Sequence, residues 1–252
     1  MNWINKIPLL NKIKTKTYIH RETRICLYHA DVFFKPIYAG AKNLQSVMNI
    51  SLGGVGLKKS NFSPLPEKGE VIPGQLILKN QTIELSLKVI HVTDKIIGCK
   101  YLTAPNHLEY VLSKFFQTEF SAHKLIQIDP HVLQSKGRST PYYFRGANSD
   151  ELYYVMGDSE IEQFNIIIDS QILVGSAHTH FKFGYVKKLI EDKVHGYKRE
   201  DPIEWRANIN ESFIDDCQKF IDNIEMLNSG HRKILQHLLQ SARTKNLNIS
   251  EI

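Results

Sequence analysis

Apolar and polar residues alternate strictly along one stretch in the first half of the chain. The alternating apolar positions are Leu76 and Leu78, and then Ile83, Leu85, Leu87 and Val89. A period of two is typical of a half-buried antiparallel strand, and the polar pair Asn80-Gln81 between the two runs permits a turn. The pattern therefore predicts a β-hairpin over residues 76–89.

Further strands are predicted on either side of this hairpin. Residues 25–34 are rich in β-branched and aromatic side chains, and strands are also predicted over residues 44–50 and 96–102. Pro36 and Gly40 interrupt the first of these strands. Residues 61–74 hold Pro64, Pro66, Gly69, Pro73 and Gly74, so this region is predicted to be a loop.

One amphipathic helix follows the strands. Asn106 is predicted to cap it, with Glu109 three residues later as in a capping box. The apolar residues that recur at the helical period are Leu108, Val111, Leu112, Phe115 and Phe116. Several antiparallel strands followed by one such helix, over residues 106–120, predict a small closed β-barrel with a helix packed against it.

The second half of the chain predicts a separate α+β unit. Residues 121–140 are interpreted as a connector, and strands are predicted over residues 151–156, 160–168 and 181–186. Asn210 is predicted to cap a helix, and Gly230 is predicted to mark a break before a second one. The apolar face of the first helix is Phe213, Ile214, Cys217, Phe220, Ile221 and Ile224, and that of the second is Ile234, Leu235, Leu238 and Leu239. The fold class is thus mainly β with C-terminal helices.

The charge is divided unevenly between these two units. The chain has 252 residues and a net charge of +6, yet residues 1–120 carry 16 Lys and Arg against 8 Asp and Glu, whereas residues 121–252 carry 16 against 18. The basic balance therefore belongs to the first half, which is the half expected to meet an anion.

Other features limit the classes of protein that fit. No run of about 18 apolar residues exists, so no transmembrane segment is predicted. The first residues lack a long apolar stretch followed by a small-residue cleavage site, so no signal peptide is expected. Three widely spaced cysteines, Cys26, Cys99 and Cys217, are interpreted as reduced core residues of a cytoplasmic protein.

The candidate chemistry lies in a turn with arginines upstream. Asn49-Ile50-Ser51-Leu52-Gly53-Gly54 follows the pair Arg21 and Arg24. Glycines let a backbone approach a ligand closely, and guanidinium groups match phosphate oxygens and stack on bases. Asn49 and Ser51, two positions apart, point to the same face if the chain is extended there. This pattern favours a phosphorylated, base-bearing ligand over a catalysed reaction.

These residues resemble the PilZ domain, a bacterial receptor module for cyclic di-GMP. That family carries an Arg-x-x-x-Arg segment and then an [Asp/Asn]-x-Ser-x-x-Gly motif, which is intact here from Asn49 to Gly54. The predicted barrel and closing helix follow the family's order, and Gly98-Cys99-Lys100-Tyr101 matches its Gly-x-x-[Phe/Tyr] strand. The resemblance covers residues 16–120. It divides the chain into a basic segment (residues 1–17), a PilZ-like barrel (residues 18–120) and an α+β domain of no recognised family (residues 141–252).

The resemblance implies roles for seven residues and one departure. Arg24 takes the place of the second arginine, but His20 occupies the place of the first, with Arg21 beside it. Arginines of the family clasp phosphate and stack on guanine, whereas the second motif contacts guanine and its sugar. The ligand-binding residues implied are His20, Arg21, Arg24, Asn49, Ser51, Gly53 and Gly54. The ligand is cyclic di-GMP, no other cofactor is implied, and the C-terminal unit is expected to relay binding to a partner protein.

Alternatives remain open. A PilZ-type adaptor that binds no nucleotide, and works through contacts with motility or pilus machinery, is favoured by the replaced first arginine. An RNA- or DNA-binding barrel is a weaker reading prompted by the basic half, and no nucleic acid is expected as partner. His178 and His180 share a face at strand spacing, but two ligands do not define a metal site. No Gly-x-Ser-x-Gly turn occurs, so the protein is not expected to be an enzyme.

Overall fold

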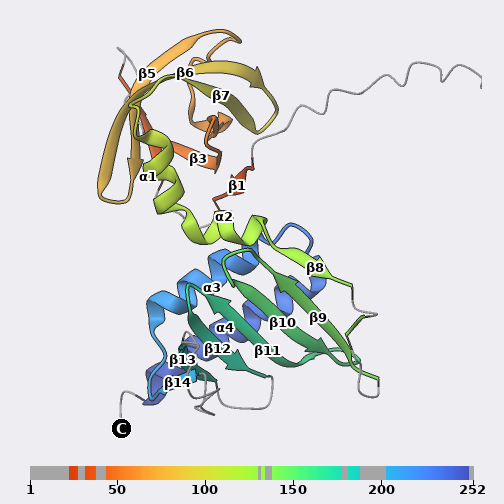
Figure 1. Cartoon of the computed structure of the whole chain (residues 1–252). Helices are drawn as coiled ribbons and strands as arrows, with labels where there is room; N and C mark the ends of the chain where they lie inside the picture. The colour runs from red at the N-terminus through yellow and green to blue at the C-terminus, as the bar shows by residue number, and fades with distance from the viewer. Residues whose placement is uncertain are drawn as a thin grey trace, which may run out of the picture.

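The computed structural model describes residues 23–27, 32–37, 44–129, 132–133, 138–176, 181–187 and 203–249. Two antiparallel sheets contain more of this part of the chain than its helices do, and each has its own hydrophobic core. Figure 1 shows the first sheet as an upper unit and the second sheet, with two helices behind it, as a lower unit. The expected fold class, mainly β with C-terminal helices, is confirmed.

The first sheet closes into a barrel. Its strand order is β1-β3-β2-β5-β6-β7-β4, and a further pairing of β3 with β4 joins the ends of a ring of six strands. The short strand β1 lies outside this ring and pairs with the end of β3. The strands are β1 (Ile25–Cys26), β2 (Val32–Pro36), β3 (Gln45–Ile50), β4 (Gly54–Lys58), β5 (Val71–Leu78), β6 (Gln81–Val92) and β7 (Ile96–Thr103). A 3₁₀ turn, η1 (Lys59–Asn61), follows β4.

The predicted hairpin is present as β5 and β6, with two differences. The turn is Lys79-Asn80 rather than Asn80-Gln81, since Gln81 pairs with Leu78, and Lys79 adopts a left-handed φ of 52°. β5 also begins at Val71, inside the region predicted to be a loop. Gly74 is tolerated there because its missing side chain leaves room for the ring of Phe34 on β2.

The helix that closes the barrel is shorter than predicted. α1 (Leu108–Phe115) buries Leu108 and Leu112 in the barrel core, as the apolar pattern indicates. Its N-cap is His107 and makes no side-chain cap hydrogen bond, so the predicted capping by Asn106 is wrong. The chain turns at Phe116, which is itself fully buried, and a second helix, α2 (Gln117–His123), follows.

The second sheet is a meander of seven strands in sequence order, β14-β13-β12-β11-β10-β9-β8. The strands are β8 (Ile126–Ile128), β9 (Thr140–Arg145), β10 (Glu151–Met156), β11 (Ile161–Ile168), β12 (Gln171–Gly175), β13 (Lys182–Val186) and β14 (Ile203–Arg206). The predicted strands correspond to β10, β11 and β13. The region predicted to be a connector contains the end of α2 and β8.

Two helices cover one face of this sheet. α3 (Glu211–Asn223) begins as predicted, since the Asn210 side chain accepts a hydrogen bond of 3.0 Å from Ser212 N. The predicted apolar residues of α3 are all buried. The break before α4 (Ser229–Ile249) lies at Ile224–Asn228, ahead of Gly230. Arg232 of α4 donates to the carbonyl groups of Ile224 and Leu227 in this break and to that of Asp222 near the end of α3.

The two units meet through α2 and β1, both of which contact α3. The barrel core ends with Phe116 in sequence, and the core of the second unit begins with Ala122. Phe120, which lies between them on α2, packs against the barrel core. The proposed domain limits stay predictions, and residues 1–17 lie outside the described part of the chain.

A chain that ends after Lys124 should fold on its own, because it keeps every residue of the barrel core. We expect one cooperative thermal transition and a β-type circular dichroism spectrum. Aggregation, or a broad transition without cooperativity, would show that the barrel depends on packing against α3.

Candidate functional site

Pairing of β1 with β3 brings the basic segment to the candidate motif. Ile25 lies opposite Ile50, and Cys26 lies opposite Asn49. The next amide, Leu27 N, donates to Met48 O over 3.1 Å. Arg24 directly precedes this short ladder and is exposed, so its backbone lies beside the turn that follows Ile50. His20 and Arg21 lie outside the described residues.

Ser51 organises the turn of the motif. Its backbone N–H donates to Gly54 O over 2.8 Å. Its hydroxyl accepts from Gly53 N and donates to Gly54 O, each at 3.3 Å. Tyr101 of β7 holds the same turn, because its hydroxyl donates to Ser51 O over 3.4 Å and its backbone N–H to Gly53 O over 3.1 Å. Ser51 therefore shapes the motif whether or not a ligand is present.

Gly54 is required by a close backbone approach. It pairs with Lys100 of β7, and a Cβ atom at this position would run into the carbonyl group of Cys99. The clash would be with backbone, which cannot rotate away as a side chain can. The last glycine of the motif is thus explained by closure of the barrel between β4 and β7.

Asn49 lies on the outer wall of the barrel. Its carboxamide covers Gly56 of β4, where an added Cβ would come within 2.7 Å of Asn49 Oδ1. The neighbours of Gly56 on β4, Val55 and Leu57, point into the core, so Gly56 faces outward. Because β3 ends at Ile50, the alternation that would place Asn49 and Ser51 on one face stops before Ser51.

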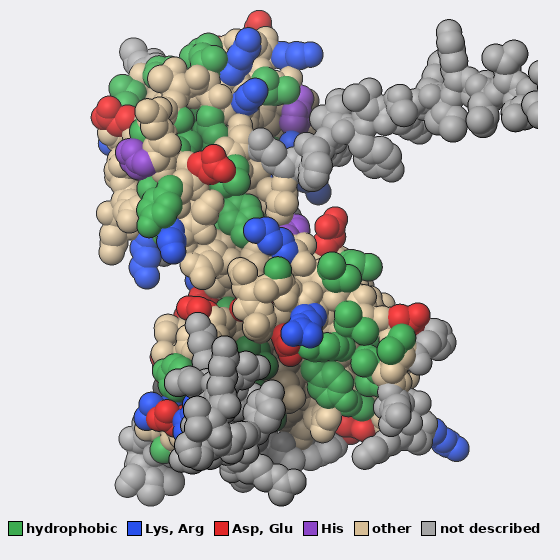
Figure 2. Space-filling model, in the orientation of Figure 1, with side chains coloured by type: hydrophobic (Ala, Val, Ile, Leu, Met, Phe, Trp, Pro, Cys, Tyr) green, Lys and Arg blue, Asp and Glu red, His purple; other side chains and the backbone are tan. Residues whose placement is uncertain are grey.

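The wall next to the motif is basic. Lys100 lies opposite Gly54 on one side and opposite Lys88 of β6 on the other, and Lys58 ends β4. All three side chains are exposed. Figure 2 also shows Lys and Arg side chains at the top of the barrel, at the end away from β1 (Figure 1). The charge division found in the sequence therefore includes lysines on the strands beside the motif.

Arg24 also lies close to α2, the helix that connects the two units. The ring of His123 on α2 forms a hydrogen bond with the backbone of Arg24. Burial lowers the pKa of His123, and this outweighs the opposite effects of Glu225 and of that hydrogen bond. The residue that leads into the motif is thus in contact with the helix that packs on α3.

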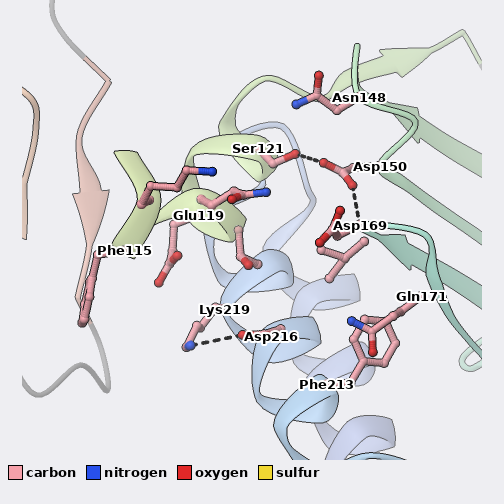
Figure 3. A pocket seen from close by; sticks show the side chains of 14 residues that line it. Phe115, Glu119, Ser121, Asn148, Asp150, Asp169, Gln171, Phe213, Asp216 and Lys219 are labelled. Carbon is pink, nitrogen blue, oxygen red and sulfur yellow. Dashed lines mark hydrogen bonds and ion pairs between the residues drawn. The ribbon is translucent and has the colours of Figure 1, made fainter. Parts of the chain in front are cut away.

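A cleft of about 430 Å³ opens between α1–α2, the turns at the ends of β10, β11 and β12, and α3. Figure 3 shows Glu119 and Asp150 among its lining residues. Asp150 is buried and accepts hydrogen bonds from the Ser121 hydroxyl and, over 2.9 Å, from Asp169 N. Burial raises the pKa of Glu119, which faces the ion pair of Lys219 with Asp216. No short motif links these residues, so the cleft could not be predicted from the sequence.

An aromatic cluster joins α4 to the second sheet. The hydroxyl oxygen of Tyr154 lies 2.8 Å from His231 Nδ1, and the ring of Tyr154 stacks on that of Tyr142 with the centroids 4.9 Å apart. Burial raises the pKa of Tyr154 and lowers that of His231. Both groups are therefore neutral near pH 7, and their contact serves packing and hydrogen bonding between sheet and helix.

The thiols that the structure describes are not reactive. Burial raises the pKa of Cys99 to about 12 and that of Cys217 well above its usual range. A thiolate is the nucleophilic form of cysteine, so these two residues serve packing. His178 and His180, the weak metal candidates, lie outside the described residues.

Comparisons with known proteins add little. No family model matches the chain, and no curated protein matches it. One match among solved structures is the crystal structure of an uncharacterized Legionella protein, with 19% sequence identity and a TM-score of 0.29, covering 37% of this chain and 89% of that one. A likeness of this size carries no argument about fold or function. Among the helices that the structure describes, none combines the length and apolar character needed to cross a bilayer.

Replacing Gly54 by alanine should destabilise the barrel by about 1–3 kcal/mol, because the added methyl group meets backbone at the Cys99 carbonyl. Thermal unfolding of the variant beside the wild type measures this. Gly230→Ala is the control, since its nearest neighbour would be Asn228 Oδ1 at 3.2 Å in the exposed first turn of α4. Equal effects of the two changes would contradict the close approach of β4 and β7.

The lowered pKa of His123 predicts a pH dependence of stability. A histidine whose pKa is lower in the folded state stabilises that state fully above its unfolded pKa of about 6.5, and this contribution is lost as pH falls through the folded pKa. The free energy of unfolding should therefore begin to fall as the pH drops below about 7.5, and should keep falling until the pH has passed the folded pKa of His123. His123→Gln should make this slope shallower, whereas His107→Gln, at an exposed position, should leave it unchanged.

Proposed function

We propose that this protein is a PilZ-type receptor that binds cyclic di-GMP and passes the signal to a partner protein. The observation that carries the proposal is the β1–β3 ladder, which sets Arg24 beside the Asn49–Gly54 turn on a closed barrel. The basic wall around the turn suits a ligand with two phosphates.

Each residue of the site would have a separate role in binding the ligand. Arg24 supplies a guanidinium group for phosphate and for stacking on a base, and Asn49 presents an amide that hydrogen-bonds guanine. Ser51 and Gly53 hold the turn, and Gly54 lets β4 and β7 close beneath the ligand. His20 and Arg21 belong to the same proposal as partners of Arg24, with His20 in the place of the first arginine of the family.

Recognition without turnover fits this arrangement. The hydroxyl of Ser51 is bonded within its own turn, and the thiol of Cys99 is buried with a raised pKa. Neither group is available as a nucleophile beside the motif. We therefore propose a binding protein and no catalysed reaction.

The signal would leave the barrel through Arg24 and β1. β1 contacts α3, and the backbone of Arg24 bonds His123 of α2. A ligand that pulls Arg24 toward the turn would change both contacts. The size of the response in the second unit would depend on how much more tightly the ligand binds one conformation of these contacts than the other. The surface of the second unit would then meet the partner protein.

An adaptor that binds no nucleotide is the second candidate. Two observations favour it: Ser51 is satisfied within its turn, and Gly54 is required by packing against Cys99. Both structural roles would preserve the sequence of the motif in a barrel that no longer binds the ligand. The two candidates differ in one measurable property, the affinity for cyclic di-GMP.

Calorimetric titration of the full chain with cyclic di-GMP at low salt tests the proposal, with GTP and cyclic di-AMP as controls. We expect a dissociation constant between sub-micromolar and tens of micromolar, and weaker binding of both controls. A titration without heat up to about millimolar ligand, equivalent to about −4 kcal/mol, would favour the adaptor.

Arg24→Ala should weaken this binding by about tenfold to a hundredfold, since a hydrogen bond to a charged group contributes about 1.5–3 kcal/mol. His20→Ala should cost less, because a neutral imidazole is a poor phosphate ligand. Arg145→Ala, an exposed arginine on β9, is the matched control and should leave the affinity unchanged. Unchanged affinity in the Arg24 variant would mean that another residue serves as the second arginine.

A further inference from the structure

Asn49 belongs to a row of four residues that crosses the outer wall of the barrel. Asn49 of β3 pairs with Gly56 of β4, Gly56 pairs with Gly98 of β7, and Gly98 pairs with His91 of β6. Directly paired residues of antiparallel strands point to the same face. Two glycines therefore form a floor, with an amide at one end and an imidazole at the other.

A bulge turns His91 to this outer face. Along β6, Leu85, Leu87 and Val89 point into the core, and strict alternation would send His91 inward as well. The register shifts between Val89 and His91, so Ile90 is an extra residue there and His91 faces outward. Bulges are frequent next to binding sites, where they redirect a side chain.

The imidazole of His91 lies flat on the wall. An added Cβ at Gly98 would run into its ring, so the ring covers Gly98 much as the Asn49 amide covers Gly56. Ile90, the extra residue beside His91, is 43% exposed. An aromatic ring with an exposed apolar neighbour, on a wall that also carries Lys88 and Lys100, offers a nucleotide both a stacking surface and positive charge.

We propose that His91 forms the far end of the ligand site and stacks on a purine base. The inference rests on the proposed function and extends it to a residue that the motif does not contain. β3 and β6 are three strand spacings apart, about 14 Å along the wall. One base of a cyclic dinucleotide lies near Arg24 and Asn49, the other lies against His91, and Lys100 between them meets phosphate.

The test compares His91→Ala and His91→Phe in the full chain, with His107→Ala as the matched control. His107 is exposed on the same unit and makes no side-chain cap bond, so its removal should change nothing. We expect His91→Ala to weaken cyclic di-GMP binding about tenfold, because it removes a stacking surface, and His91→Phe to stay within about threefold of the wild type. GTP, which has a single base, should lose less affinity than cyclic di-GMP in His91→Ala.

Gly98→Ala provides a second test that keeps the histidine. The added methyl group displaces the ring from the wall, so cyclic di-GMP binding should weaken again while a thermal transition shows that the barrel is folded. Wild-type affinity in both His91→Ala and Gly98→Ala, beside a wild type that binds, would overturn the role of His91 and leave the proposed function standing.

Two further outcomes would also decide whether the inference is right. A wild type that binds no cyclic di-GMP overturns the proposed function and this inference together. A short single-stranded oligonucleotide is titrated in parallel, because stacking rings and lysines also suit single-stranded nucleic acid. If the oligonucleotide binds more tightly than cyclic di-GMP and depends on His91, the wall is a nucleic-acid site and the inference is wrong.

Discussion

A strand of two residues, β1, positions the candidate site. β1 lies outside the ring of six barrel strands and is held by its pairing with the end of β3. That pairing fixes Arg24 beside the Asn49–Gly54 turn, and it also places the same stretch against α3 and His123. Without it, the arginine would have no defined relation to the motif, and the barrel would have one fewer contact with the second unit.

The residues of the motif stabilise the barrel even without a ligand. Ser51 closes the turn after β3, Tyr101 holds that turn to β7, and Gly54 allows β4 to approach the Cys99 carbonyl. These interactions are made by the protein alone. They pre-organise the turn, so a ligand would not have to order it, and such pre-organisation lowers the cost of binding. The same interactions would preserve the motif in a protein that no longer bound a nucleotide.

Local periodicity predicted much of the fold because each pattern reports burial on one face. The alternation in β6 and the helical repeat from Phe213 to Ile224 both correspond to buried residues. The prediction failed where tertiary packing overrides the period. Asn106 does not cap α1, and Phe116 interrupts the expected helix because its side chain fills the barrel core. Gly74 continues a strand because the ring of Phe34 occupies the space that a side chain at position 74 would take.

Part of the candidate site could likewise be predicted from the sequence, and part could not. The turn and Arg24 could be found from the sequence, because they are close in the chain and chemically distinctive. His91 could not, since only the extra residue at Ile90 turns it outward, and a bulge has no clear signature in a single sequence. The cleft of Glu119 and Asp150 was missed because its residues come from helices and turns far apart in the chain.

Amide hydrogen exchange of β1 tests the central claim most directly. The amide of Leu27 donates to Met48 O, so its exchange reports on the β1–β3 ladder. If the ladder holds Arg24 in place and the ligand pulls on it, cyclic di-GMP should slow exchange over residues 23–27 and change it on α2. Ligand binding that leaves exchange unchanged in both segments would contradict the account, because the site would then be coupled neither to β1 nor to the second unit.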